Sequence, residues 1–203
     1  MKIAILGASG RTGRLLVRQA LDAGHDVRAL VRSPGTFLLR HDKLEVVEGE
    51  VGNAQAVAAL VSGCDAVASA LGPSPGHVTS CSEGTKHVIA AGAKRYVAVS
   101  GAGLDVPGDK KDLIGKVVSF FVRTLSPAVF QDKVNELKML QDSSLPWVLV
   151  RPPRLVDAPA TGAYRVSLER SPGASISRAD LASFVLKCLT STEFNRQAPF
   201  IAG

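Results

Sequence analysis

The sequence predicts an α/β fold in which residues 1–203 form a single domain around one doubly wound parallel sheet. Short apolar, β-prone runs alternate with segments of helical spacing along the chain. No Pro/Gly/Ser-rich linker and no internal repeat interrupts this alternation. Parallel strands need crossover connections, and these are usually helices that pack on the two faces of the sheet. The alternation therefore predicts strands side by side, with helices on both faces.

The chain begins with a strand, a glycine-rich turn, a helix and a second strand. Residues 2–6 form a β-prone run that is apolar after Lys2, and residues 7–13 read Gly-Ala-Ser-Gly-Arg-Thr-Gly. Apolar residues then recur at helical spacing up to Gly24. Glycine adopts positive φ cheaply, and it lets a pyrophosphate approach the N–H groups of a helix N-terminus. This context predicts a dinucleotide site, and the alternative is a glycine-rich turn without a ligand. The expected contacts of the turn are Gly7, Ser9, Gly10, Arg11, Thr12 and Gly13.

The second strand, residues 26–31, is followed by Arg32 and Ser33. At this position an NAD-specific site carries an acid that binds the ribose 2′-hydroxyl. A carboxylate would repel a 2′-phosphate, whereas a guanidinium and a hydroxyl would bind it. The pattern predicts NADP(H) as the cofactor, and Arg11 is expected to add to the same charge. The alternative is a pair of solvated surface arginines.

The following elements continue the alternation. Asn53 is expected to cap one helix and Ser177 another, because both side chains can accept a hydrogen bond from a free helical N–H group. After the third and fourth strands, Glu50-Val51 and Leu71-Gly72 are expected to contact the cofactor. The expected elements are strand 44–47, helix 54–61, a strand with its exit loop over 65–72, loop 73–79, helix 82–91, strand 94–99, helix 129–143, strand 146–150, strand 163–168, helix 178–189 and strand 199–202.

Two segments are less regular and are expected to cover a substrate, at about 104–128 and 152–176. Residues 117–125 are strongly apolar, with Phe120 and Phe121 among them. The two interpretations are a core helix and a lid whose apolar side covers a flat substrate. Lys116 and Arg123 argue against a membrane segment.

Composition narrows the class of protein. Aromatic residues make up only 5% of the chain, so the core must be built mainly from Ala, Val and Leu. The net charge of +6 is spread along the chain without a polybasic run, which favours small anionic ligands over nucleic acid. Three widely spaced cysteines predict neither a disulfide framework nor a metal site. With no signal-peptide pattern at the N-terminus, we expect a cytoplasmic protein. We also expect a monomer, without nucleic-acid or membrane partners.

Several segments together resemble one family. They are the glycine turn, Leu30-Val31-Arg32, Ser82-Glu83-Gly84, Arg151-Pro152-Pro153, Thr161-Gly162-Ala163-Tyr164, the run from Ile176 to Ala182, and Lys187-Cys188-Leu189-Thr190. In this order they resemble the biliverdin-IXβ reductase/flavin reductase group of atypical short-chain dehydrogenases/reductases, close to the NmrA-like proteins. The resemblance implies an NAD(P)-binding Rossmann fold and NADPH-dependent reduction of flavins or of biliverdin-type tetrapyrroles.

The sequence also departs from that family. Gly101 stands where the family has a serine, with Ser100 one place earlier, and Arg154 stands where it has a histidine. Ordinary short-chain enzymes carry a Tyr-x-x-x-Lys acid pair, but here Tyr96 and Tyr164 are followed four residues later by Ser100 and Leu168. A conjugated acceptor tolerates the absence of this acid, because solvent can supply the proton.

The candidate catalytic residues are Ser100, Arg154 and Lys133. The resemblance implies that Lys133 faces the nicotinamide ribose, and the alternative is a surface helix lysine. Arg154 is expected to contact the acceptor, the alternative being an ion pair at the sheet edge. Pro153 and Leu155 are expected to contact the cofactor. Two other functions remain open, a non-catalytic NADP(H) sensor of the NmrA-like type and a quinone reductase.

Overall fold

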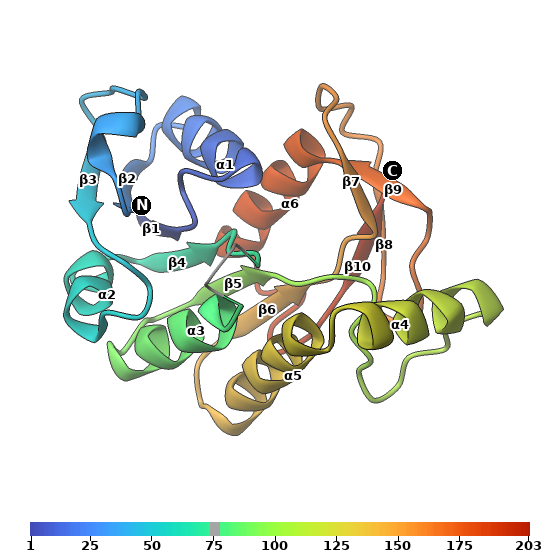
Figure 1. Cartoon of the computed structure of the whole chain (residues 1–203). Coiled ribbons are helices and arrows are strands. Elements are labelled where there is room, and N and C mark those ends of the chain that lie inside the picture. The colour runs from blue at the N-terminus through green and yellow to red at the C-terminus, as the bar shows by residue number, and fades with distance from the viewer. Residues whose placement is uncertain (74–77) are drawn as a thin grey trace.

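A six-stranded parallel sheet organises the molecule, with the strand order β3-β2-β1-β4-β5-β6 (Figure 1). The computed structural model describes residues 1–73 and 78–203, apart from the side chains of residues 114, 118 and 122. The strands are β1 (Lys2–Leu6), β2 (Asp26–Val31), β3 (Leu44–Glu48), β4 (Ala66–Ser69), β5 (Tyr96–Val99) and β6 (Trp147–Val150). The α/β fold class predicted from the sequence is confirmed.

Helices pack on both faces of this sheet. Helices α1 (Arg11–Asp22) and α6 (Arg178–Thr190) share one hydrophobic core with the strands. Helices α2 (Ala54–Val61), α3 (Ser80–Ala90) and α5 (Pro127–Asp142) share the core on the opposite face (Figure 1). The prediction of a doubly wound sheet is thus confirmed. A short 3-10 helix, η1 (Pro34–Thr36), follows β2.

The strands read as continuous apolar runs because both of their faces are covered. In β1, Ile3 and Ile5 belong to the core beneath α1 and α6, whereas Ala4 and Leu6 belong to the core on the other face. Successive side chains of a strand point to opposite faces, so a strand in the middle of the sheet must be apolar at every position. The core consists largely of small aliphatic side chains, as the low aromatic content predicted.

The predicted helix caps are present. The side chain of Asn53 accepts hydrogen bonds from the N–H groups of Gln55 and Ala56 at the start of α2. The Ser177 side chain accepts one from the N–H of Asp180 at the start of α6. The helix predicted from residue 82 begins at Ser80 instead. Most of the loop predicted at 73–79 lies outside the described residues.

The chain after β6 forms two small sheets beside the main one. Strand β7 (Arg154–Val156) pairs in parallel with β9 (Ser175–Ser177). Strand β8 (Arg165–Ser167) pairs antiparallel with β10 (Phe200–Ala202), within the regions predicted as strands 163–168 and 199–202. The sequence did not predict β7 and β9, because three residues are too few to show a periodicity.

Helix α4 (Leu113–Leu125) contains the apolar run, yet it presents large side chains to solvent. Phe120 is 55% exposed and Phe121 is 53% exposed, and Leu113 and Leu125 are exposed as well. The interpretation of this run as a core helix is therefore wrong for these residues. No helix within the described chain is both long and apolar enough to span a membrane.

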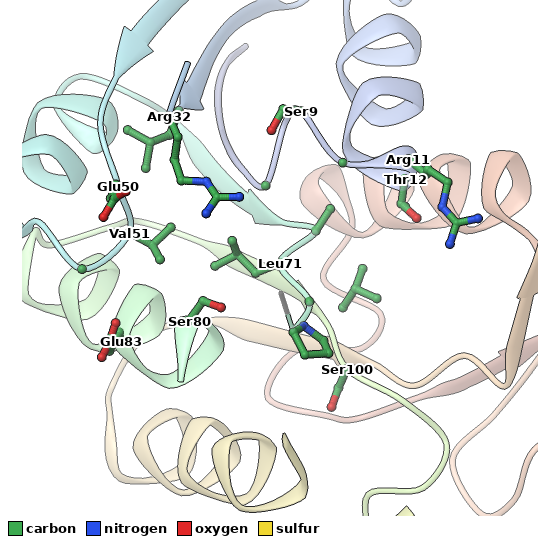
Figure 2. Close-up of a pocket in the computed structure, with 18 of the residues that line it drawn as sticks. Ser9, Arg11, Thr12, Arg32, Glu50, Val51, Leu71, Ser80, Glu83 and Ser100 are labelled. Atoms are coloured by element: carbon green, nitrogen blue, oxygen red, sulfur yellow. The ribbon is translucent and has the colours of Figure 1, made fainter. Parts of the chain in front are cut away.

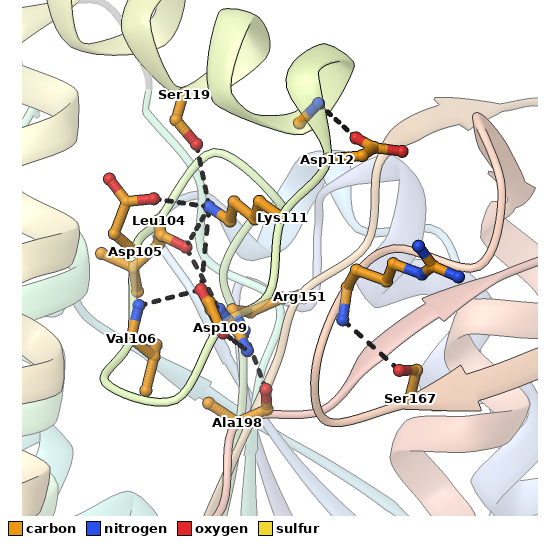
Figure 3. Close-up of polar contacts among 12 residues, drawn as sticks. Leu104, Asp105, Val106, Asp109, Lys111, Asp112, Ser119, Arg151, Ser167 and Ala198 are labelled. Atoms are coloured by element: carbon orange, nitrogen blue, oxygen red, sulfur yellow. Dashed lines mark hydrogen bonds and ion pairs between the residues drawn. The ribbon is translucent and has the colours of Figure 1, made fainter.

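A buried polar cluster fixes the segment that leads into α4 (Figure 3). The Arg151 guanidinium donates to both carboxylate oxygens of Asp109, at 2.7 and 2.8 Å, and lies 3.6 Å above the centre of the Phe200 ring. The Lys111 ammonium donates to the Leu104 carbonyl and to the Ser119 hydroxyl of α4. These bonds hold the segment against the end of β6.

Candidate cofactor-binding site

A cleft of about 550 Å³ opens at the carboxyl ends of the sheet strands (Figure 2). It lies where the chain order reverses between β1 and β4, the position at which open α/β sheets bind ligands. The lining residues are Gly7, Ser9, Gly10, Arg11, Thr12, Leu30, Arg32, Gly49, Glu50, Val51, Gly52, Ala70, Leu71, Gly72, Pro73, Ser80, Glu83, Val99, Ser100, Lys133, Leu155 and Arg178.

The three glycines of the turn have different structural roles. Gly7 has φ +71°, and a Cβ there would lie 2.8 Å from the carbonyl carbon of Ala70. A Cβ on Gly13 would lie 2.0 Å from the Gly7 carbonyl oxygen, so α1 packs on the turn only without a side chain. Gly10 has φ −71°, which any residue adopts. Positive φ is thus required at Gly7, whereas Gly10 is needed only for close approach, with its Cβ position 3.2 Å from the Gly7 oxygen.

The N-terminus of α1 is open to an anion. Its N-cap residue is Gly10, which has no side chain that could accept a hydrogen bond from the helix. The first turn of α1 also contains no acidic residue. Backbone N–H groups and the helix dipole therefore face the cleft without a partner from this helix. The turn glycines and this open helix end fit the pyrophosphate of a dinucleotide.

The two arginines predicted to act together are separated. Arg32 and Glu50 lie on one side of the cleft, whereas Arg11 lies on the side of α6 (Figure 2). The Arg11 guanidinium donates to Asp157 at 3.2 Å. The structure therefore does not place Arg11 beside Arg32, where it was expected to add to the same charge. Ser33 is exposed and lies outside the lining.

Ser100 and Lys133 both line the cleft near the end of β5. The Ser100 hydroxyl is buried and has no hydrogen-bond partner within the described residues. The Lys133 ammonium donates to the Val99 carbonyl at 2.9 Å and to Glu136 at 3.1 Å. Its side chain is only 12% exposed, so the alternative of a surface lysine is wrong. The unpaired hydroxyl is a donor available to a ligand.

A buried polar network lies behind Lys133. Glu136 accepts from the Thr85 hydroxyl at 3.2 Å, and that hydroxyl lies 3.0 Å from the hydroxyl of Tyr96. Burial raises the pKa of Tyr96, which is inaccessible to solvent. Burial opposes the positive charge of Lys133, but the carboxylate of Glu136 outweighs it, and the pKa of Lys133 lies above its ordinary value. Lys133 is therefore protonated at neutral pH.

Four predicted site residues lie outside the lining, namely Gly13, Ser33, Pro153 and Arg154. Arg154 is exposed on β7, whereas its neighbour Leu155 lines the cleft. Adjacent side chains of a strand point to opposite sides, so the two residues do not share the cleft. Within the described chain Arg154 makes no ion pair, which argues against its alternative role at the sheet edge.

Sequence reasoning missed two informative lining residues. Arg178 begins α6 and is 8% exposed, and its guanidinium donates to Asp157 at 2.7 Å. Glu83, in the first turn of α3, accepts from the Thr79 hydroxyl. Arg178 directly follows the predicted cap Ser177, so the sequence showed that a positive charge stands at the start of this helix. Nothing in the sequence, however, placed α6 beside α1. Among the described residues no cluster of His, Cys, Asp or Glu could hold a metal ion.

A family model described as NAD(P)H-binding matches residues 7–192. The chain belongs to this family. A curated relative, the (4-alkanoyl-5-oxo-2,5-dihydrofuran-3-yl)methyl phosphate reductase of Streptomyces griseus, is 27% identical, and the match covers 99% of this chain and 67% of the relative. The family binds NAD(P)H, and the cleft described above is the candidate site for this cofactor.

Two solved structures share the fold at low identity. A short-chain dehydrogenase/reductase of Veillonella parvula in complex with NADP has a TM-score of 0.83 and 20% identity, covering 100% of this chain and 94% of that one. ChuY, an anaerobillin reductase from Escherichia coli O157:H7, has a TM-score of 0.82 and 20% identity, covering 100% and 97%. Both matches establish the Rossmann-type architecture over the whole chain.

Proposed function

We propose that the protein is an NADPH-dependent reductase that delivers a hydride to a flat, conjugated acceptor, such as a flavin or a biliverdin-type tetrapyrrole. One observation carries this proposal. None of the described residues that line the cleft is a tyrosine, a histidine or a cysteine. Histidine is the commonest proton donor near neutral pH, and tyrosine and cysteine also take this role. Of the two lining glutamates, Glu50 lies on the Arg32 side of the cleft (Figure 2) and Glu83 accepts from the Thr79 hydroxyl. The cleft therefore suits an acceptor that needs no enzymatic acid.

Lys133 does not replace the missing acid. Its pKa is raised above the ordinary lysine value, so it releases a proton poorly near neutral pH. It instead supplies a fixed positive charge at the end of the cleft, where negative charge develops on an acceptor that has received a hydride. The electron pair spreads over the conjugated system, and a solvent proton completes the reduction.

Other lining residues bind the cofactor and orient the acceptor. The N–H groups at the start of α1 hold the pyrophosphate, and Arg32 holds the 2′-phosphate. The Ser100 hydroxyl donates a hydrogen bond to the carboxamide end of the cofactor. The chemistry that NADPH supplies when bound is hydride donation. Leu155 and Leu71 provide apolar surface that orients a flat partner.

The relatives support the choice of acceptor class. The Streptomyces griseus relative is named as a reductase of an unsaturated, phosphate-bearing ring, and ChuY is an anaerobillin reductase. The Veillonella parvula structure contains NADP, which agrees with the arginine after β2. These names concern the other proteins, and they motivate the panel of acceptors below.

The direct test is the loss of NADPH absorbance with FMN, riboflavin, biliverdin and quinones. We expect turnover with at least one flavin or tetrapyrrole, and a faster rate than with NADH. Because the described residues of the lining include no histidine, the pH profile of the reduction should show no limb near about 6.5. NADPH binding without oxidation of any acceptor would contradict the proposal and favour the NADP(H) sensor. Turnover of quinones alone would favour the quinone reductase.

We further propose that Arg154 contacts an acceptor that extends beyond the cleft rim. Arg154→Ala should then raise KM for FMN more than for riboflavin, because only FMN carries a phosphate. The expected difference is about 1–3 kcal/mol, the range for a hydrogen bond to a charged group. Equal effects on FMN and riboflavin would show that Arg154 does not reach the acceptor.

A further inference from the structure

Two arginines of the cleft lining bind one carboxylate. Asp157, just after β7, accepts from Arg11 at 3.2 Å through one oxygen and from Arg178 at 2.7 Å through the other. Arg11 is the first residue of α1, and Arg178 is the first residue of α6. The carboxylate thus joins the N-terminal ends of two helices that begin at the same cleft.

The three groups differ in their contact with solvent. The side chain of Arg178 is 10% exposed, whereas those of Asp157 and Arg11 are 64% and 74% exposed. A guanidinium has five N–H donors, yet within the described chain that of Arg178 donates only to Asp157. A buried cation with unused donors facing a ligand cleft can accept a further anion.

We propose that Arg178 binds a phosphate of the bound dinucleotide and that Asp157 is the counter-ion that this phosphate displaces. The proposal rests on cofactor binding by this cleft and is independent of which acceptor is reduced. Arg178 is then a cofactor-binding residue, and Asp157 is an internal competitor for the two arginines.

Electrostatics favours this exchange. The N-terminus of α1 has no acid of its own, so Asp157 is the carboxylate that the tertiary structure brings next to the pyrophosphate position. A carboxylate bound to Arg11 and Arg178 weakens the attraction of both for a second anion. The pyrophosphate carries more negative charge than one carboxylate, and the N–H groups of α1 also bind it. The more exposed partner, Asp157, is the group that can return to water at low cost.

The experiment measures the dissociation constant of NADPH by calorimetry for the protein and its variants. Asp157→Asn should tighten NADPH binding about fivefold, because it removes the competing charge while keeping the side-chain shape. Arg178→Met should weaken binding at least about tenfold, and Arg178→Lys should restore part of the loss. In Arg178→Met, adding Asp157→Asn should give a smaller gain, since only Arg11 is then released.

Glu169→Gln provides a matched control. Glu169 is similarly exposed, at 57%, and is paired with Lys110 at 2.6 Å, but neither residue lines the cleft. This variant makes the same change of net charge and should bind NADPH like the unmutated protein. Thermal unfolding of each variant without NADPH shows whether a change in affinity reflects a change in stability.

Three results would overturn the proposal. NADPH binding to Asp157→Asn that is unchanged or weaker would make Asp157 a structural tie only. Unchanged binding to Arg178→Met would remove Arg178 from the cofactor site. An effect seen in KM for FMN, with an unchanged NADPH dissociation constant, would assign Arg178 to the phosphate of the acceptor. Failure of the unmutated protein to bind NADPH would instead refute the cofactor site itself, before any variant is compared.

Discussion

The N-termini of α1 and α6 meet at one cleft, yet they are built in opposite ways. At α1, Gly10 offers no side-chain cap, and the first turn has no acid. At α6, the Ser177 hydroxyl accepts from the N–H of Asp180 at 2.9 Å. The carboxylate of Asp180 in turn accepts from the N–H groups of Thr161 and Gly162, at 2.9 and 2.8 Å. One helix end is open, and the other is occupied by the protein itself.

This difference gives the two helix ends different roles: the end of α1 is free to bind a ligand, whereas the end of α6 anchors a loop of the protein. Both helix ends attract negative charge for the same physical reason, the free N–H groups and the aligned peptide dipoles. Where the chain supplies its own acceptor, the helix end holds a loop, here the segment around residues 161–162. Where the chain supplies only glycine, the helix end is free for a phosphate. The following predictions test this division, beginning with the largest effect.

Gly13→Ala should disrupt the open end most strongly. A Cβ at this position would lie 2.0 Å from the backbone oxygen of Gly7, which cannot rotate away. We expect a loss of about 3 kcal/mol in the free energy of unfolding, as for a severely overpacked site. Denaturant titration measures it. Gly35→Ala is the control, because a Cβ on Gly35 meets no atom within 4 Å and Gly35 has no positive φ. Equal stability of the two variants would contradict the packing role of Gly13.

Gly10→Val should remove cofactor binding and leave the fold intact. Gly10 has φ −71°, so valine brings no φ strain, and its Cβ would lie 3.2 Å from the Gly7 carbonyl oxygen. The branched side chain would add bulk at the N-cap of α1, where a pyrophosphate needs close approach to the backbone. We expect NADPH binding to weaken at least a hundredfold, about 2.7 kcal/mol. NADPH fluorescence reports binding, and circular dichroism reports the fold. Retained enhancement of NADPH fluorescence would show that this turn holds no dinucleotide.

Asp180→Asn should weaken the occupied end. Burial raises the pKa of Asp180, but the hydrogen bonds from Gly162, Ser177 and Thr161 outweigh it and hold that pKa below its ordinary value. A carboxyl with a depressed folded-state pKa stabilises the fold above its unfolded pKa of about 3.9, and this contribution is lost as the pH falls through the folded-state pKa. We expect a loss of about 2 kcal/mol at neutral pH.

The pH dependence of this variant distinguishes charge from shape. The difference in unfolding free energy between Asp180→Asn and the unmutated protein should be constant above about pH 5 and shrink below about pH 3.9. Denaturant titrations over this range measure it. NADPH affinity should change little at neutral pH, since Asp180 does not line the cleft. A difference that is independent of pH would show that the charge of Asp180 does not stabilise α6.

Arg32→Ala should have the smallest effect, confined to the choice of cofactor. We expect the unmutated protein to bind NADPH at least tenfold more tightly than NADH, about 1.4 kcal/mol, because Arg32 meets the 2′-phosphate alone. The variant should lose most of this preference while binding NADH as before. Calorimetry with both cofactors measures the change. Equal dissociation constants for NADPH and NADH in the unmutated protein would refute the assignment.

The sequence predicted well which residues line the cleft at the carboxyl ends of the strands. The order strand, glycine turn, helix, strand follows local rules of spacing and backbone conformation, and these rules placed Gly7, Arg32 and Leu71 at one edge of the sheet. It predicted less beyond that cleft. Phe120 and Phe121 of α4 are exposed and not part of a core, and Arg154 lies outside the cleft lining. That these two segments cover a substrate stays a prediction.

The sequence by itself determined the fold class, the open N-terminus of α1 and the arginine after β2. Each of these depends on residues close together in the chain, where periodicity and glycine chemistry act directly. Only the tertiary structure decided the partners of the charged groups. Asp157 and Arg11 are 146 residues apart in the sequence, and Lys133 is 34 residues from the carbonyl that it contacts. A charge shows no preference for a distant partner until the packing of helices and strands brings the two together.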